Sequence, residues 1–290
     1  MRELKILAVV VFFTGALYWG VEPFAHTQLH PHVEAPEYTF DDVDGLNGAT
    51  GNATNGAELV AANCTACHSI EKVGFPAIMD DVSAAASYGV VPPDLGSAGH
   101  IYDENYLAAF IKDPAKATLT AHKFVDGHVH PMPGYGWMQP NEIADIVAYL
   151  KSIAPKTMSN KEVFVDACQR CHSIKYGDFY GSSMTAKTPD ENIKTYMGTI
   201  PPDLSQYIRS RGESYLHEFV NNPQKHLAGT AMPRVGLNKT AEDQVIEYMT
   251  EVGDSKKSQR ESLAGPFLGY LVIFAIFAWL WKAKIWREVH

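Results

Sequence analysis

The sequence predicts an all-α protein in which one helical domain occurs twice between two apolar terminal segments. Three observations predict it: helical periodicity without sustained strand alternation, an internal repeat, and an uncharged apolar run near each end. The periodic segments span residues 57–70, 104–112, 141–153, 161–172, 213–221 and 241–251. The chain has 290 residues, 46% of them apolar, which is enough to build two compact cores.

The internal repeat begins with a Cys-x-x-Cys-His sequence, which occurs at Cys64 and again 104 residues later at Cys168. Four landmarks follow each copy in the same order: a Pro-Pro-Asp-Leu sequence, a segment starting Tyr-Leu, a Met-Pro pair and a closing amphipathic helix. Self-similarity over one domain length indicates duplication. We therefore expect a linker at 26–55, a first repeat at 56–155 and a second repeat at 156–255.

The C-terminal apolar run has 20 uncharged residues, Ser262–Trp281, and would be about 30 Å long as a helix, which matches the hydrocarbon core of a bilayer. It predicts a transmembrane helix at 262–283 and a tail at 284–290. Basic residues follow the span at once, so the positive-inside rule predicts a cytoplasmic tail and repeats on the outer side. These basic residues are Lys282, Lys284 and Arg287.

The N-terminal apolar run is shorter, with 16 uncharged residues at Ile6–Val21. This length lies between a signal-peptide core and a full span, so residues 1–25 are predicted to be a signal anchor or a signal peptide. Either would translocate the chain that follows. Tyr18 and Trp19 favour a retained anchor, because aromatic side chains prefer the membrane interface.

The formal net charge of −9 argues against nucleic acid as a partner, which would require clustered Lys and Arg. An acidic surface instead favours a basic protein partner. All four cysteines belong to the two Cys-x-x-Cys-His sequences, which leaves none for a disulfide or a nucleophile.

Cys-x-x-Cys-His is the attachment signature of c-type haem. The thiols of Cys64 and Cys67 would bond to the haem vinyl groups, and His68 would be an axial ligand of the iron. The same roles in the second repeat fall to Cys168, Cys171 and His172. A redox dithiol would need a βαβ context, and a four-cysteine zinc ribbon would need closer pairs. The sequence therefore predicts two covalently bound haem c groups.

The sixth ligand of each iron is predicted to be the methionine of the Met-Pro pair, Met132 in the first repeat and Met232 in the second. The argument is their equivalent position, and a thioether ligand raises the haem potential relative to nitrogen. Other residues remain open as ligands: His128, His130 and Met138 at the first iron, and Met184, His217 and His226 at the second.

The Pro-Pro-Asp-Leu sequences are predicted to form stiff loops in which Pro93 and Pro202 line the haem. The alternative is an ordinary helix-start turn, with Asp94 and Asp203 as capping residues.

The second repeat resembles cytochrome c1, the haem subunit of ubiquinol:cytochrome c oxidoreductase, through CQRCH, PPDLS and the C-terminal anchor. The additional first repeat resembles the dihaem form of this subunit in some bacterial reductases. The resemblance implies two tandem class I cytochrome c domains on the periplasmic side of the bacterial cytoplasmic membrane. It also implies cytochrome b and Rieske iron-sulfur partners, membrane lipid around the anchors, and a soluble or oxidase-bound cytochrome c acceptor.

The function expected from these features is electron relay from a Rieske centre to a periplasmic cytochrome c or a terminal oxidase, with no catalysis by the isolated chain. One alternative is the dihaem subunit of a cbb-type oxidase, against which the C-terminal anchor argues. Another is a dihaem peroxidase or a thiosulfate-oxidising dehydrogenase. Two Met-Pro pairs at matching positions argue against the open iron that such an enzyme needs.

Overall fold

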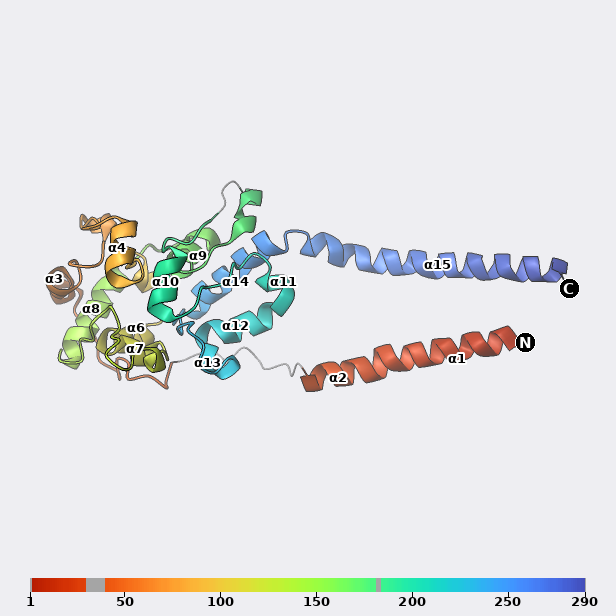
Figure 1. Ribbon diagram of the computed structural model, residues 1–290, viewed down its shortest axis with the longest axis horizontal. Coiled ribbons are helices and arrows are strands. Elements are labelled where there is room, and N and C mark those ends of the chain that lie inside the picture. The colour runs from red at the N-terminus through yellow and green to blue at the C-terminus, as the bar shows by residue number, and fades with distance from the viewer. Residues whose placement is uncertain (1, 30–39, 181–183, 290) are drawn as a thin grey trace. The chain divides into compact units, whose positions relative to one another are not determined.

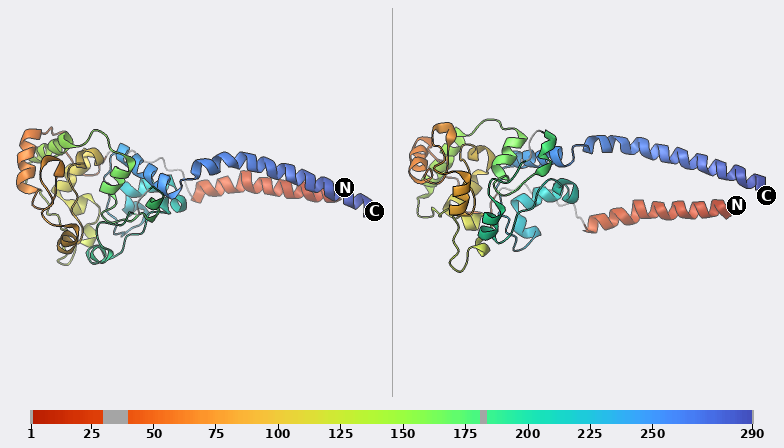
Figure 2. Two further views of the ribbon diagram at one scale, coloured as in Figure 1. Left: turned by 90° about the horizontal axis from the view of Figure 1, so that it is seen from above. Right: turned by 45° about the horizontal axis from the view of Figure 1, so that its top comes forward.

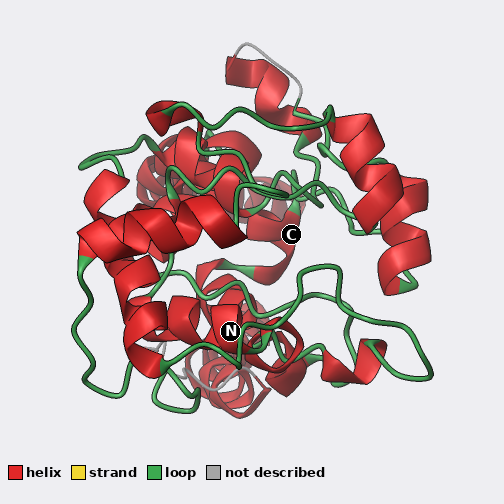
Figure 3. Cartoon of the chain, turned by 90° about the vertical axis from the view of Figure 1, so that its left-hand side faces the viewer, coloured by secondary structure: helices red, strands yellow, loops and turns green. Residues whose placement is uncertain are grey.

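The computed structural model describes residues 2–29, 40–180 and 184–289, and it divides into two compact units, Met1–Glu37 and Tyr38–His290. Within the described residues all regular structure is helical, and Figure 3 shows only helices and loops. Extended pairing is limited there to three isolated bridges. The prediction of an all-α fold is confirmed.

The first unit contains α1 (Arg2–Ala16), the π-helical turn η1 (Leu17–Val21) and α2 (Glu22–Leu29). Residues Arg2–Ala25 have a mean hydropathy of 1.9 and are long and apolar enough to cross a membrane. This agrees with the predicted N-terminal apolar helix. Part of the predicted linker, residues 30–39, lies outside the described residues.

The first repeat is built on α3 and α8, which cross at very close range. The elements are α3 (Ala53–Asn63), η2 (Glu71–Val73), α4 (Asp81–Tyr88), α5 (Ala98–Ile101), α6 (Glu104–Lys112), α7 (Pro114–Ala117), η3 (Ala121–Lys123) and α8 (Pro140–Ile153) (Figure 1). A Cβ on Gly56 would lie 1.9 Å from the carbonyl oxygen of Asp145, so only glycine allows this crossing. Val60, Ile143 and Val147 fill the core between the two helices.

The second repeat places α9 against α14 in the same way. Its elements are α9 (Asn160–Ala167), η4 (Lys175–Tyr180), α10 (Asp190–Met197), α11 (Tyr207–Arg211), α12 (Glu213–Asn221), α13 (Pro223–His226) and α14 (Lys239–Gly253). Its core contains Phe164, Val245 and Tyr248. Ile101 of the first repeat is buried in this second core, so the two repeats pack directly against each other.

Two of the predicted helices are too long. Those expected at 57–70 and 161–172 end at Asn63 and Ala167, because the Cys-x-x-Cys-His residues that follow form a tighter turn. Sequence periodicity also missed α4 and α10, which are each only 8 residues long. By contrast, the helices at 104–112 and 213–221 have the predicted bounds.

The C-terminal helix α15 (Lys257–Val289) is one unbroken helix in both views of Figure 2. It passes through Pro266, and Lys257–Glu288 has a mean hydropathy of 2.1 and the length to cross a membrane. The helix is longer than the predicted span at 262–283 and continues into the residues predicted as a tail. The domain boundaries given above stay predictions.

Candidate haem-binding sites

The Cys-x-x-Cys-His residues of the first repeat form a single turn at the end of α3. The N–H of Cys64 donates to the carbonyl of Val60 at 2.9 Å, and Cys67 and His68 both donate to the carbonyl of Cys64, at 3.1 and 2.9 Å. These bonds satisfy carbonyls that the end of α3 would otherwise leave without partners. They also fix both thiols and the imidazole relative to one backbone turn.

The second repeat reproduces this turn at the end of α9. Cys168 donates to Phe164 at 2.9 Å, and Cys171 and His172 donate to the carbonyl of Cys168 at 3.1 and 2.9 Å. The corresponding distances in the two repeats are therefore the same. The same hydrogen-bond pattern presents two thiols and one histidine in each repeat.

Each histidine of these turns is oriented by the Pro-Pro-Asp-Leu loop of its own repeat. Nδ1 of His68 lies 2.8 Å from the carbonyl oxygen of Pro93, and Nδ1 of His172 lies 2.9 Å from that of Pro202. A carbonyl can only accept, so Nδ1 carries the proton and the Nε2 lone pair is available to a metal. Burial lowers the pKa of both histidines, which favours this neutral form.

The aspartates of the same loops fasten them to the residues that follow the haem motif. Asp94 accepts from the N–H of Glu71 at 2.9 Å, and Asp203 accepts from that of Lys175 at 3.0 Å. The helices α5 and α11 start further along the chain, so these carboxylates do not cap them. The helix-start alternative for the two loops is therefore wrong. The carbonyls of Pro93 and Pro202 lie beside His68 and His172, and the prediction that these prolines line haem stays a prediction.

Burial disfavours the thiolate form of the first cysteine of each motif, which is the form that a metal site would need. Burial raises the pKa of Cys64 to about 11 and that of Cys168 to about 12. No group of three or more His, Cys, Asp or Glu side chains is placed to hold a metal ion in the part of the chain that the structure describes. This arrangement does not fit a structural zinc site made by the two pairs together.

The segment that carries Met132 lies next to the first haem motif. The hydroxyl of Tyr135 donates to the carbonyl of Asn63 at 2.8 Å, and Asn63 directly precedes Cys64. Burial raises the pKa of Tyr135, and Cys64 and Cys67 raise it further. Met132 itself is half-buried. Sequence reasoning missed Tyr135, because an aromatic residue in a loop has no distinctive spacing.

The segment that carries Met232 packs with the second haem motif against one core. Val235 and Cys168 are both partly buried against the cluster that contains Leu237. The N–H of Val235 also donates to the carbonyl of Val220 at 3.1 Å. Met232 is half-buried, like Met132.

Several residues that competed with these methionines are engaged elsewhere. Met138 is buried in the core of the first repeat, and the sulfur of Met184 accepts from the hydroxyl of Tyr248 at 3.0 Å. His217 lies 2.5 Å from a carboxylate oxygen of Glu242. Nε2 of His226 lies 2.9 Å from a carboxylate oxygen of Glu218, although the angle between them does not allow a hydrogen bond. His128 and His130 lie in the Met132 segment itself, where Nδ1 of His130 is 3.2 Å from the Met132 nitrogen.

A cavity of about 430 Å³ is lined by residues of both haem motifs. Cys67 and Pro93 of the first repeat line it together with Arg170 of the second. Arg170 donates to the hydroxyl of Tyr102 at 3.2 Å, while its Nε is buried with no hydrogen-bond partner among the described residues. Burial lowers the pKa of His68 most, and the charge of Arg170 lowers it further. Spacing alone could not single out this arginine, since either x of the motif can be any residue.

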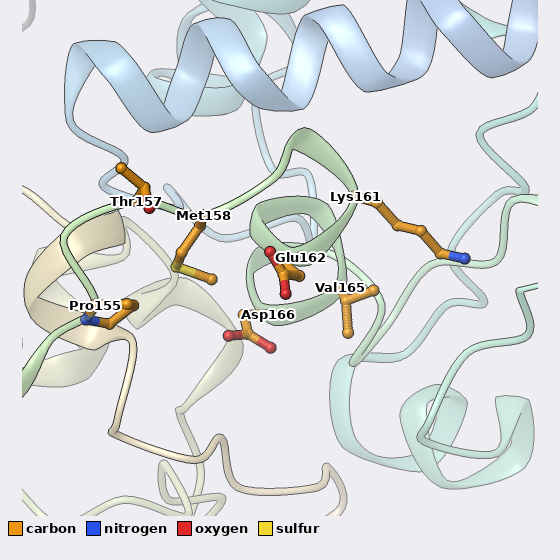
Figure 4. A pocket seen from close by; sticks show the side chains of 7 residues that line it. All are labelled: Pro155, Thr157, Met158, Lys161, Glu162, Val165 and Asp166. Atoms are coloured by element: carbon orange, nitrogen blue, oxygen red, sulfur yellow. The ribbon is translucent and has the colours of Figure 1, made fainter. Parts of the chain in front are cut away.

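A second cavity, of about 320 Å³, lies beside α9 and contains no residue of the haem motifs (Figure 4). Glu162 and Asp166 line it from α9, with Met158 beside them. It therefore belongs to the junction between the repeats rather than to either haem site.

The residues of both repeats fit haem c on the chemistry of their donors. Each repeat supplies two thiols on one turn, a neutral imidazole with a free Nε2, and a carbonyl that orients the imidazole. An oriented proximal histidine of this kind is the usual axial ligand of haem iron. In each repeat a half-buried methionine lies in a segment that packs with the motif.

Comparison with known proteins gives three findings. Residues 53–154 match the family model described as cytochrome c. Cytochrome c2 of Pararhodospirillum photometricum is 28% identical over 113 residues, covering 36% of this chain and 98% of the relative. A solved chain of "Hyperthermophilic respiratory Complex III" is 20% identical, and the match covers 98% of this chain and 99% of the solved chain. Its TM-score is only 0.31, so this similarity supports no inference about fold or function.

The family match covers the first Cys-x-x-Cys-His turn, His68 and its Pro93 partner, and Met132. A cytochrome c domain binds haem c covalently through such a motif. The chain therefore contains a cytochrome c domain at residues 53–154 and is a cytochrome c-type electron carrier.

Proposed function

We propose that the chain is a membrane-anchored dihaem cytochrome c that relays electrons from the Rieske centre of a quinol:cytochrome c reductase to a periplasmic cytochrome c or a terminal oxidase. The observation that carries the proposal is the second proximal site. The hydrogen-bond distances of its turn and its histidine-to-proline distance match those of the cytochrome c domain to within 0.1 Å. This supports a second haem c on residues 156–255.

When bound, haem c supplies reversible one-electron chemistry. The residues of the chain hold the group and set its environment. The two thiols of each turn attach it, the carbonyls of Pro93 and Pro202 orient the imidazoles of His68 and His172, and Met132 and Met232 are the proposed sixth ligands. Thioether ligation favours the reduced state and suits transfer to a high-potential acceptor.

The two terminal helices support a membrane location for this relay. Both have the length and hydropathy of a span, and basic residues follow the apolar part of α15. By the positive-inside rule the C-terminus is cytoplasmic and the repeats face the periplasm. The terminal helix α15 favours the reductase subunit over a dihaem subunit of a cbb-type oxidase, the second candidate, for which only an N-terminal anchor is expected.

The test is purification of the full chain from membranes with its natural partners. We expect cytochrome b and a Rieske protein to co-purify, and quinol to reduce both haems. A pyridine haemochrome assay should give two haem c groups per chain. One haem per chain would contradict the dihaem assignment, and purification with an oxidase that lacks cytochrome b would favour the second candidate.

A further inference from the structure

The two repeats contact each other through the segments that carry the proposed sixth ligands. Directly after Met232, residues 234–238 run along the first repeat. The N–H of Arg234 donates to the carbonyl of Thr118 at 2.8 Å, and the carbonyl of Gly236 accepts from Asp103 at 3.0 Å. The N–H of Asn238 donates to Ile101 at 3.0 Å. The segment is thus bonded through its backbone to the other repeat.

Tyr106 of the first repeat is the central side chain of this contact. It is buried, and its hydroxyl donates to the carbonyl of Arg234 at 2.7 Å. Its ring lies against Gly236, where a Cβ would fall 2.0 Å from the ring, and Gly236 has a φ of +76°. A glycine is therefore required for the segment to turn around this ring.

The Met132 segment of the first repeat is in turn contacted by Tyr196 of the second repeat. The ring centroid of Tyr196 lies 5.7 Å from that of Phe124, 6.3 Å from His128 and 6.5 Å from His130. Nδ1 of His130 in turn contacts the backbone of Met132. Aromatic rings at these separations attract each other. The second repeat thus completes the packing around the Met132 segment.

Helix α10, which carries Tyr196, is fixed on α4 of the first repeat (Figure 1). Asn192 donates to the carbonyl of Ala85 at 3.3 Å, and the buried hydroxyl of Thr188 accepts from the N–H of Val91 at 3.1 Å. A Cβ on Gly89 would lie 2.7 Å from the Cβ of Tyr196, so a glycine at this position leaves the space that Tyr196 occupies. Tyr196 is therefore positioned by contacts that span the two repeats.

We propose that each repeat positions the sixth ligand of the other, with Tyr196 acting on Met132 and Tyr106 acting on Met232. The proposal rests on the function proposed above, because it takes these methionines as ligands. A thioether binds iron weakly, so ligation depends on the order of the segment that carries it. Losing one interdomain contact should therefore affect the haem of the opposite repeat.

The first experiment replaces Tyr196 by Ala in the full-length, detergent-purified holoprotein. The thioether-to-iron absorption band and the spin state by electron paramagnetic resonance are recorded during a redox titration that separates the two haems. We expect the first haem to lose most of its band and to become partly high-spin, while the second keeps its band. Tyr196→Phe should restore the band, and Thr195→Ala, exposed on the same helix, is the matched control.

The second experiment removes only the hydroxyl of Tyr106, by Tyr106→Phe. We expect the second haem to lose part of its band and its potential to fall, while the first haem is unchanged. Tyr149→Phe is the control, because it removes a hydroxyl of the same repeat that makes no bond to residues 234–238.

Met132→Ala and Met232→Ala serve as references, since each should abolish the band of one haem and so assign the signals. If both bands survive in these references, the ligands of the proposed function are wrong and the positioning proposal fails with them. If the references behave as expected but Tyr196→Ala or Tyr106→Phe affects only the haem of its own repeat, or neither haem, the ligands stand and only the positioning proposal is overturned.

Discussion

The two repeats are alike on the proximal side, which is the Cys-x-x-Cys-His turn and its Pro-Pro-Asp-Leu loop. They differ on the distal side, which is the segment around Met132 or Met232. On the proximal side, the hydrogen-bond distances of the turn and the histidine-to-proline distance agree between the repeats to within 0.1 Å. On the distal side, the residue five positions after each methionine differs, since Leu237 after Met232 is 1% exposed whereas Trp137 after Met132 is 68% exposed. Haem attachment requires one arrangement of the two thiols and the histidine, whereas the segments around the two methionines pack against different neighbours.

The largest effect is expected from replacing the sixth ligands. Met232→Ala should lower the potential of the second haem by roughly 0.2 V, because axial ligands set haem potentials over a range of about 0.8 V. Met132→Ala should do the same at the first haem. Potentiometric titration measures both, and if either variant titrates like the wild type, that methionine is not a ligand.

The next effect concerns the backbone of the Met232 segment. Gly236→Ala should lower the free energy of unfolding by about 3 kcal/mol, because the new Cβ meets the Tyr106 ring and the φ is positive. Gly229→Ala should cost only about 1 kcal/mol, since its φ is similar at +77° but nothing lies within 4 Å. Denaturant titration compares the two. Equal losses would show that the ring contact contributes nothing.

A smaller effect is expected from the arginine that both haem sites share. Arg170→Gln should lower the potentials of both haems by about 50 mV, because a nearby buried cation stabilises the reduced state by about 1 kcal/mol. Lys187→Gln is the control, since this exposed lysine lines the same cavity but is screened by water. If the potential of only one haem shifts, Arg170 does not act on both haem sites.

The smallest effect is a pH dependence at the second proximal loop. Burial alone would raise the pKa of Asp203, but hydrogen bonds from Ser205, Ser173 and Lys175 outweigh it and hold the pKa below its usual 3.8. The carboxylate therefore stabilises the fold above pH 3.8, and this stability is lost as the pH falls through the lower folded value. Asp203→Asn should make the free energy of unfolding depend less on pH in that range. Asp190→Asn, an exposed change on α10, should not.

Much of this fold could be predicted from the sequence because haem attachment and helix formation depend on local spacing. The two Cys-x-x-Cys-His motifs, the amphipathic helices at 104–112 and 213–221 and the apolar termini follow from residue order alone. The helix ends at Asn63 and Ala167 were missed, since the motif turn overrides the periodic pattern. The short α4 and α10 were missed because 8 residues give too weak a period.

Residue order alone predicts two Cys-x-x-Cys-His motifs in a repeated helical pattern between two apolar helices, because motif spacing and hydrophobic period depend only on neighbouring residues. The packed fold was needed to show that Asp94 and Asp203 fasten loops rather than cap helices, and that Arg170, Tyr106 and Tyr196 contact the opposite repeat. The contacts by which these residues join distant parts of the chain span from 23 to 128 residues. Contacts over such separations depend on how the helices pack, which no local pattern records.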